Sequence, residues 1–239
     1  AGLRVSFAVS PAGVEEIRVA PGVAIDRLGR LIEVARPACL RLDRWWATTA
    51  ADDLQRAAYL AVPEAVDEAA LSGLISARAA AAETLPARAV VADVFMRFLA
   101  CEQGRTPVFA SGPYDALDAT GIARLRDAYE LLLVARGGLD VDYDGLPDRG
   151  PDLAAIADPD DRRAALSDAV LDAWPADGVP KPAPEHPDKV DPSAQFIARV
   201  LIPVAAGNPP SRDGAAVIVD NGSRRLVPSA QLLQRWLGI

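Results

Sequence analysis

The sequence has few of the residue types on which enzyme active sites most often depend. Its 239 residues include one histidine, His186, two cysteines, Cys39 and Cys101, and one methionine. A Ser-His-Asp or Cys-His catalytic system would have to use His186. That residue lies in a proline-rich stretch, where a rigid general base is improbable, and we predict a solvated loop histidine. The sequence thus predicts a protein without enzymatic activity.

Several motifs and segments are also missing. There is no Gly-x-Ser-x-Gly elbow, phosphate-binding Gly-Lys-Ser loop, dinucleotide-binding Gly-x-Gly-x-x-Gly or His-Glu-x-x-His helix. No run of about 18 apolar residues exists, so we expect no membrane insertion. The first residues lack the apolar core of a signal peptide, which predicts synthesis in the cytoplasm. Two cysteines are too few for a disulfide scaffold or a zinc site, and we predict that Cys39 and Cys101 are small buried hydrophobes.

The charge balance limits the kinds of partner. The chain carries 33 acidic and 25 basic residues, a net charge of −8. Because phosphate backbones attract basic surfaces, this excess of acid argues against nucleic acid as the partner. Hydrophobic residues make up 51% of the chain, which is enough for a sizeable core. The length predicts one large domain or two small ones.

The pattern of apolar residues is mainly that of strands. Alternation predicts strands near residues 5–9 and 17–19, and Asp26 and Gly29 predict a hairpin turn between the runs that flank them. Residues 87–100 fit helical spacing, but their β-branched and aromatic content favours a strand. We predict further strands at 58–62, 129–134 and 195–204, a hairpin at Asn221-Gly222, helices at 67–84, 159–174 and 229–239, and a loop or short helix at 43–57. Asp158 is the expected N-cap of the helix at 159–174.

This order of elements predicts a mainly β protein with added helices, an α+β arrangement without βαβ units. We expect an antiparallel β-sandwich or barrel-like core formed by residues 1–135 and 193–228. Residues 136–192 are rich in Asp, Pro and Gly and would form a long irregular insert with one helix. Residues 229–239 would form a C-terminal helix.

One stretch has the spacing of metal ligands. Asp140, Asp142, Asp144 and Asp148 occupy positions 1, 3, 5 and 9 of a calcium-loop pattern, with Gly145 at position 6. Position 12 is a proline, so the bidentate acid of such loops is missing. The sequence predicts no cofactor, and it leaves both a calcium loop and an unliganded acidic loop open.

A second group of residues are candidates for contacts with partners. The pair Trp45-Trp46 could form a stacking platform, or one ring could belong to the core while the other covers an edge. Apolar residues recur on one side of the two later predicted helices and need a surface to cover them. These residues are Leu166, Val170 and Trp174 in the insert, and Leu232, Leu233, Trp236 and Leu237 at the C-terminus.

Five islands of sequence, taken in order, resemble structural proteins of phage tails and of phage-like contractile injection systems. In the first, a strand ends in Pro-Gly, a second carries Ala-Ile-Asp and a Gly-Arg pair starts the next. In the third island, an Arg-rich stretch precedes a strand with the order aromatic-Glu-Leu. In the fifth, an Arg-Arg pair follows a turn. The islands are residues 19–34, 58–62, 122–133, 196–200 and 219–225.

The resemblance implies a non-enzymatic, architectural subunit at a baseplate or a fibre attachment site. Its partners would be other subunits of the particle, and several copies per particle would be expected. Two other classes stay open from the sequence alone. One is a calcium- or carboxylate-dependent polysaccharide hydrolase, and the other is a stand-alone carbohydrate- or protein-binding module that uses Trp45 and Trp46.

Overall fold

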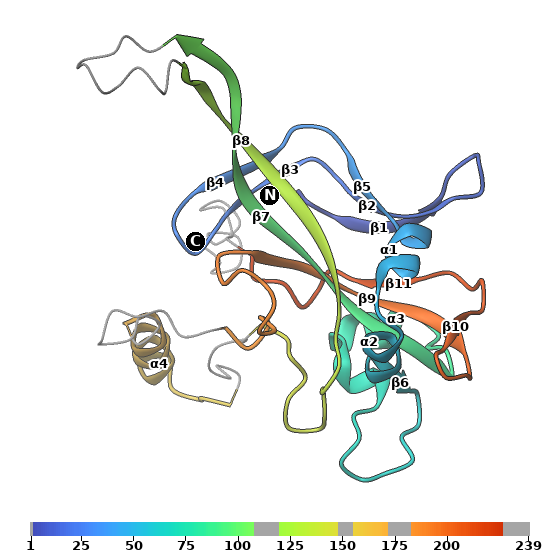
Figure 1. Ribbon diagram of the computed structural model, residues 1–239. Helices are drawn as coiled ribbons and strands as arrows, with labels where there is room; N and C mark the ends of the chain where they lie inside the picture. The colour runs from blue at the N-terminus through green and yellow to red at the C-terminus, as the bar shows by residue number, and fades with distance from the viewer. Residues whose placement is uncertain (1, 108–119, 148–154, 172–182, 227–239) are drawn as a thin grey trace.

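The computed structural model describes residues 2–107, 120–147, 155–171 and 183–226 of the chain (Figure 1). Strands account for 41% and helices for 18% of these residues, and the strands form several antiparallel sheets, with no closed barrel in the part of the chain that the structure describes. The predicted fold class, mainly β with added helices, is confirmed.

The N-terminal part forms two small sheets. Strands β1 (Val5–Val9), β2 (Glu15–Val19) and β5 (Ala38–Arg41) pair in the order β1-β2-β5, while β3 (Gly22–Ile25) pairs with β4 (Leu31–Val34). The predicted turn between β3 and β4 is confirmed. The Asp26 carboxylate accepts the backbone N–H groups of Leu28 and Arg30 at 2.9 and 2.8 Å, and Gly29 has a φ of 78°.

The central sheet contains the longest strands. Its members are β6 (Ala58–Leu60), β7 (Arg88–Pro107), β8 (Thr120–Ala135), β9 (Gln195–Ala205), β10 (Ser211–Arg212) and β11 (Ile218–Asp220). Strand β7 lies between β9 on one edge and β6 and β8 on the other. The ambiguous residues 87–100 are therefore strand, because tertiary pairing on both edges decides what periodicity left open.

Helices are few and short. They are α1 (Leu42–Thr48), α2 (Ala51–Arg56), the 3₁₀ helix η1 (Leu71–Leu74), α3 (Ala77–Ala82) and α4 (Pro159–Leu171). The helix predicted at 67–84 is wrong in extent, since only η1 and α3 form there. In the insert, the predicted cap is confirmed: the Asp158 carboxylate accepts the N–H groups of Asp160 and Asp161.

The central sheet is buried on both faces. Val90, Ala92, Val94 and Met96 of β7 face the largest hydrophobic cluster, which lies under the N-terminal sheets and α1. The residues that alternate with them face the opposite side, where η1, α3 and the segments around Leu146 and Val190 cover the sheet. This double burial explains why β9 reads as a nearly continuous apolar run.

A buried arginine breaks that apolar run. Arg199 of β9 lies directly across from Asp93 of β7, and both side chains are fully buried. All five N–H groups of the Arg199 guanidinium have an acceptor. Two go to the Asp93 carboxylate, at 2.7 and 3.0 Å, and the others to the carbonyls of Leu74, Asp144 and Gly145 at 2.6 to 3.0 Å. One side chain thus joins two strands, the end of η1 and the acidic loop.

A second buried arginine shares the same carboxylate. Nε of Arg136 lies 3.2 Å from Asp93, and the guanidinium also donates to the carbonyls of Glu185 and Gly145. Arg136 follows β8 directly, and Glu185 lies 49 residues later in the chain. The pair of contacts holds both described ends of the 136–192 segment against the central sheet.

The predicted insert is thus not uniformly peripheral. Leu139, Leu146 and Val190 near its two ends are buried, whereas Leu166 of α4 is half exposed. The stripe that was predicted to continue from Leu166 to Trp174 ends outside the described residues. The division into a β core, an insert and a C-terminal helix stays a prediction.

The hairpin predicted at Asn221-Gly222 is wrong for the described residues. Strand β11 pairs with β9, and residues 221–226 form no strand. The Asn221 side chain instead donates to and accepts from the backbone of Val5 at 2.9 and 2.8 Å, which ties this turn to β1. Tertiary hydrogen bonds therefore outweigh the local turn preference of Asn-Gly.

We expect Asp93→Ala to lower the free energy of unfolding by about 3–5 kcal/mol, because it leaves two buried guanidinium groups without their shared carboxylate. Urea denaturation measures the change. Asp43→Ala is the matched control, since Asp43 pairs with Arg41 in an exposed ion pair and its loss should be undetectable. A loss for Asp93→Ala as small as that of the control would contradict the central role of this carboxylate.

The stability of the β11 turn should depend on pH. Burial alone would raise the pKa of Asp220, but hydrogen bonds from Ser223, Ser76 and Gly222 outweigh it and place the pKa below the ordinary 3.8. A lowered folded-state pKa means that the carboxylate stabilises the fold above the ordinary value, and that this contribution is lost as the pH falls through the lower one.

We therefore expect Asp220→Asn to reduce the melting temperature most near neutral pH and progressively less as the pH falls below about 4. Melting curves of both proteins between acidic and neutral pH test this. Asp67→Asn, which changes an exposed carboxylate, should leave the curves unchanged throughout. If Asp220→Asn lowered the melting temperature by the same amount at every pH, the lowered pKa of Asp220 would be contradicted.

Candidate functional site

The most distinctive feature of the molecule is an arm formed by the outer halves of β7 and β8. We define the arm as residues 99–107 and 120–128, which pair in one continuous antiparallel register from Leu99↔Ala128 to Pro107↔Thr120. It projects well beyond the sheets (Figure 1). Nine residues of strand span roughly 30 Å. Strand β9 pairs with β7 only as far as Met96, so both edges of the arm lack a strand partner among the described residues.

The arm buries almost nothing within this chain. Residues 100–106 and 122–127 are exposed, including Ile122 at 50% and Leu125 at 67%. A lone two-stranded ribbon is marginally stable in water, and exposed strand edges readily pair with other chains. An arm of this kind is thus suited to contact another molecule.

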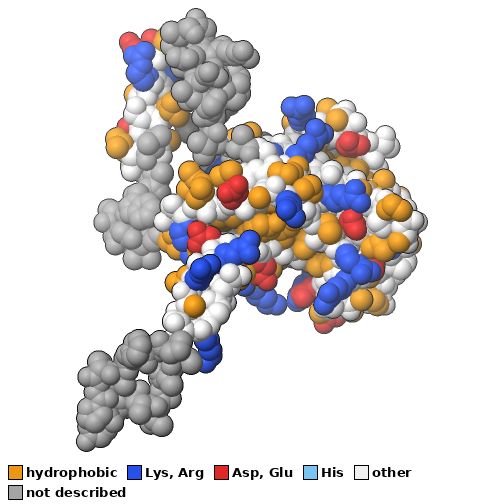
Figure 2. Space-filling view, turned by 90° about the horizontal axis from the view of Figure 1, so that it is seen from above, with side chains coloured by type: hydrophobic (Ala, Val, Ile, Leu, Met, Phe, Trp, Pro, Cys, Tyr) orange, Lys and Arg blue, Asp and Glu red, His pale blue; other side chains and the backbone are white. Residues whose placement is uncertain are grey.

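The two faces of the arm differ in charge. Cross-strand partners point to the same side of a ribbon, so the pairs Cys101↔Arg126, Gln103↔Arg124 and Arg105↔Ile122 share one face. We call these six residues the basic face. The two acids of the arm, Glu102 and Asp127, fall on the opposite face. Figure 2 shows basic side chains in view along the arm where it stands clear of the body.

The three arginines of the basic face have no ion-pair partner among the described residues. They are also fully solvated, because positions 105, 124 and 126 are all exposed. Uncompensated arginine on an exposed ribbon is a feature that binds acidic surfaces.

The base of the arm is held firmly. The guanidinium of Arg30 stacks over the ring of Phe98 at 4.7 Å, and the same side chain binds Asp26 and Ser193. Arg97 and Glu130 form an ion pair across the two strands. The arm therefore leaves the body in a direction fixed by the β3–β4 turn and the central sheet.

The acidic loop has a structural arrangement of its own. One carboxylate oxygen of Asp140 accepts the N–H groups of Asp142 and Tyr143 at 2.9 and 2.8 Å, and Asp144 accepts that of Leu146 at 2.8 Å. No three acidic, histidine or cysteine side chains come together as a metal site within the described residues. Asp148 lies outside the described residues, and calcium binding at Asp140, Asp142, Asp144 and Asp148 stays a prediction.

Gly145 has a role that the calcium-loop pattern did not suggest. Its φ is 60°, and a Cβ there would lie 2.3 Å from the guanidinium of Arg136 and 2.7 Å from the side chain of Leu139. Its carbonyl accepts from both Arg136 and Arg199. The glycine is required because its φ is positive and because the side chains of Arg136 and Leu139 occupy the space that a Cβ would take.

The tryptophan pair lies on α1 with both rings half-buried against the main core. The rings meet edge to face at 6.1 Å, and the Trp45 indole N–H donates to the carbonyl of Leu133 at 2.7 Å. Trp45 thus anchors α1 to the part of β8 that lies in the core. The other candidate contact residues, Trp174, Leu232, Leu233 and Trp236, lie outside the described residues.

Two expectations about reactive side chains are corrected. His186 is buried, not solvated: its ring packs at 5.5 Å from that of Phe95, and Nε2 lies 2.6 Å from the carbonyl of Ala194. Cys39 and Cys101 are exposed free thiols, not buried hydrophobes. The prediction for the two cysteines relied on their apolar neighbours in sequence. Side chains alternate between the two faces of a strand, so a cysteine can point to solvent while its neighbours point the other way.

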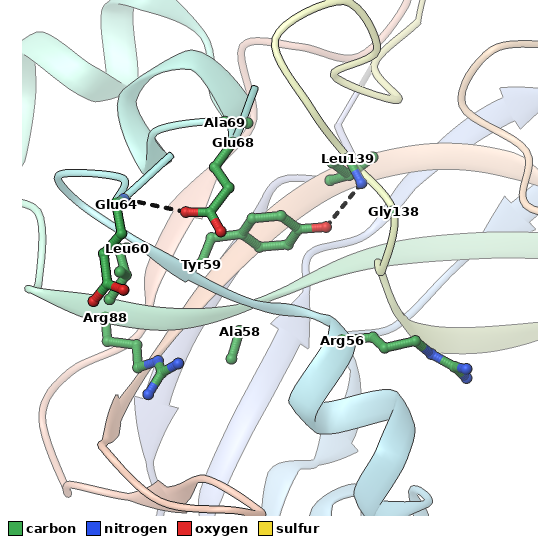
Figure 3. A pocket seen from close by; sticks show the side chains of 10 residues that line it. All are labelled: Arg56, Ala58, Tyr59, Leu60, Glu64, Glu68, Ala69, Arg88, Gly138 and Leu139. Atoms are coloured by element: carbon green, nitrogen blue, oxygen red, sulfur yellow. Dashed lines mark hydrogen bonds between the residues drawn. The ribbon is translucent and has the colours of Figure 1, made fainter. Parts of the chain in front are cut away.

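A polar pocket of about 310 Å³ lies beside β6 (Figure 3). The ring of Tyr59 crosses it, and its hydroxyl accepts from the N–H of Leu139 and donates to the carbonyl of Arg136. Burial raises the pKa of Tyr59, so the phenol keeps its proton. Glu64 and Glu68 at the rim are exposed, and Glu68 accepts the N–H of Glu64. The arrangement stabilises a loop.

Comparison with protein families, with curated proteins and with solved structures gives no match for this chain. Among the described residues, no helix has the length and apolar character needed to cross a membrane. The arm was missed by sequence reasoning, although a signal was present. In the run before residue 129, Arg124 and Arg126 alternate with Ala123 and Leu125, which is the period of a strand.

We expect Gly145→Ala to destabilise the protein by about 2 kcal/mol or more, because it adds a steric clash to the cost of a left-handed residue. Gly214→Ala is the control: Gly214 also has a positive φ, but open space surrounds its missing Cβ. Urea denaturation should give the larger loss for Gly145→Ala, and the same loss in calcium and in chelator. Equal losses for the two variants would contradict the packing role.

Proposed function

We propose that this protein is a non-enzymatic structural subunit of a multi-subunit particle, of the phage-tail-like contractile kind, at the baseplate or a fibre attachment site. The observation that carries the proposal is the arm. It is a ribbon with a firmly held base that extends roughly 30 Å from the body, and its residues 100–106 and 122–127 are exposed in the part of the chain that the structure describes. Such an element contributes little to a monomer and is well suited to connect neighbours.

Two further features support an architectural role. The strongest polar interactions, around Asp93, Arg199 and Arg136, are buried and fully used by the fold, so they are not available to a substrate. The five islands of sequence resemblance also include the Arg-rich stretch, 122–133, that forms one strand of the arm. The two alternatives, a hydrolase and a stand-alone binding module, have no comparable feature among the described residues.

An arm deletion tests the proposal. Leu99 and Ala128 are direct partners, so an Asn-Gly turn can join them and replace residues 100–127. In the native host, the tagged full-length chain should sediment with particles visible by electron microscopy, and the deleted chain should stay in the supernatant. The purified deletion should keep its melting temperature, because the arm lies outside the core.

Two results would contradict the proposal. One is a full-length chain that never sediments with a particle. The other is turnover in a screen of esterase, glycosidase, peptidase and nuclease substrates that a single Asp or Glu substitution abolishes.

A further inference from the structure

We infer that the basic face of the arm binds the acidic body of a second copy of this chain, so that copies join head to tail. This inference rests on the proposed assembly function and names one of its partners. The body here means all described residues outside the arm.

Charge complementarity points to a second copy. The described arm contains three arginines and two acids, whereas the whole chain has a net charge of −8. The described residues outside the arm contain more acidic than basic residues, so the body that every other copy presents is acidic overall. Exposed acids of the body include Glu33, Asp43, Asp52, Glu64, Asp67, Glu83, Asp140 and Asp142.

The composition of the basic face also suits a protein partner. Arg105 and Ile122 are directly paired, with Arg124 on the same side of the ribbon. Arginine is enriched in protein interfaces because its planar head binds carboxylates in pairs while its stem covers apolar surface. An exposed isoleucine among arginines adds apolar area that only a packed partner would bury.

The geometry favours arm-to-body contact over contact between two basic faces. Two identical faces with three unpaired arginines each would repel at close range. An arm that binds a body leaves that copy's own body free for the next arm. Such a heterologous contact repeats until it closes a ring or extends as a filament.

Charge reversal tests the inference. The arm variant carries Arg105→Glu, Arg124→Glu and Arg126→Glu. The control variant carries Arg36→Glu, Arg44→Glu and Arg78→Glu, which changes the net charge equally at three exposed body positions without an ion pair among the described residues. Sedimentation velocity over a range of concentrations should show oligomers for the wild type and the control. The arm variant should associate at least about 100-fold more weakly.

A mixing experiment tests separately the two surfaces of the contact, the basic face of one copy and the body of the next. The arm variant keeps an intact body, so it should accept the arm of a wild-type copy and cap the growing oligomer. Adding it to wild type should therefore shorten the oligomers, while two arm variants should not associate with each other. Adding the control variant should leave the size distribution unchanged.

Cys101 on the basic face allows direct mapping. In a Cys39→Ser background, a benzophenone maleimide on Cys101 should crosslink to body peptides of an isotope-labelled second copy. Crosslinks confined to arm peptides would overturn the arm-to-body contact. An equal loss of association in the arm and control variants would overturn the role of the basic face.

The failure of this inference is distinguishable from that of the proposed function. A wild-type chain that stays monomeric at every concentration, yet enters particles in an arm-dependent way, would overturn the second copy as partner and leave the assembly role intact. Arm-dependent binding of a duplex DNA probe by a chain that does not self-associate would likewise overturn the inference.

Discussion

The buried pair of Asp93 and Arg199 is the interaction on which the other parts of the structure depend. The pair joins β7 and β9 in the core, and Arg199 also binds the end of η1 and the acidic loop. Removing either partner leaves a charge buried without compensation, which costs far more than the intact pair contributes. The Asp93–Arg199 pair also specifies one register of β7 against β9. A slip of one residue would turn Arg199 to the other face of the sheet, where its five N–H donors would lose these acceptors.

Strands β7 and β8 contribute both to the core and to the arm. Strand β7 is buried on both faces up to Met96 and exposed beyond residue 99, without a break in its pairing with β8. A continuous ladder of hydrogen bonds therefore links the ion cluster to the arm. The stacking of Arg30 on Phe98 and the Arg97–Glu130 pair hold the point where the arm leaves the body. The position of the basic face follows from the packing of the core.

The aspartate-rich loop shows how one spacing can serve two purposes. Alternating aspartates followed by glycine suit a calcium ion, but they also suit a tight turn that caps its own backbone N–H groups. In this chain the side chains of Asp140 and Asp144 accept such N–H groups, and the carbonyls of Asp144 and Gly145 face the buried Arg199. The local pattern therefore marks a sharply folded loop, whether or not a metal ion also binds there.

The sequence by itself determined what depends on neighbours along the chain. The mainly β class, the turn at Asp26 and Gly29 and the cap at Asp158 follow from alternation and from side chains that bond the backbone nearby. Tertiary structure decided the rest. Residues 87–100 form a strand because pairing partners lie on both edges. Asn221 forms no hairpin turn because its side chain hydrogen-bonds the backbone of Val5. His186 is buried and Cys101 exposed because burial depends on which distant segments cover a residue, and no local pattern contains that information.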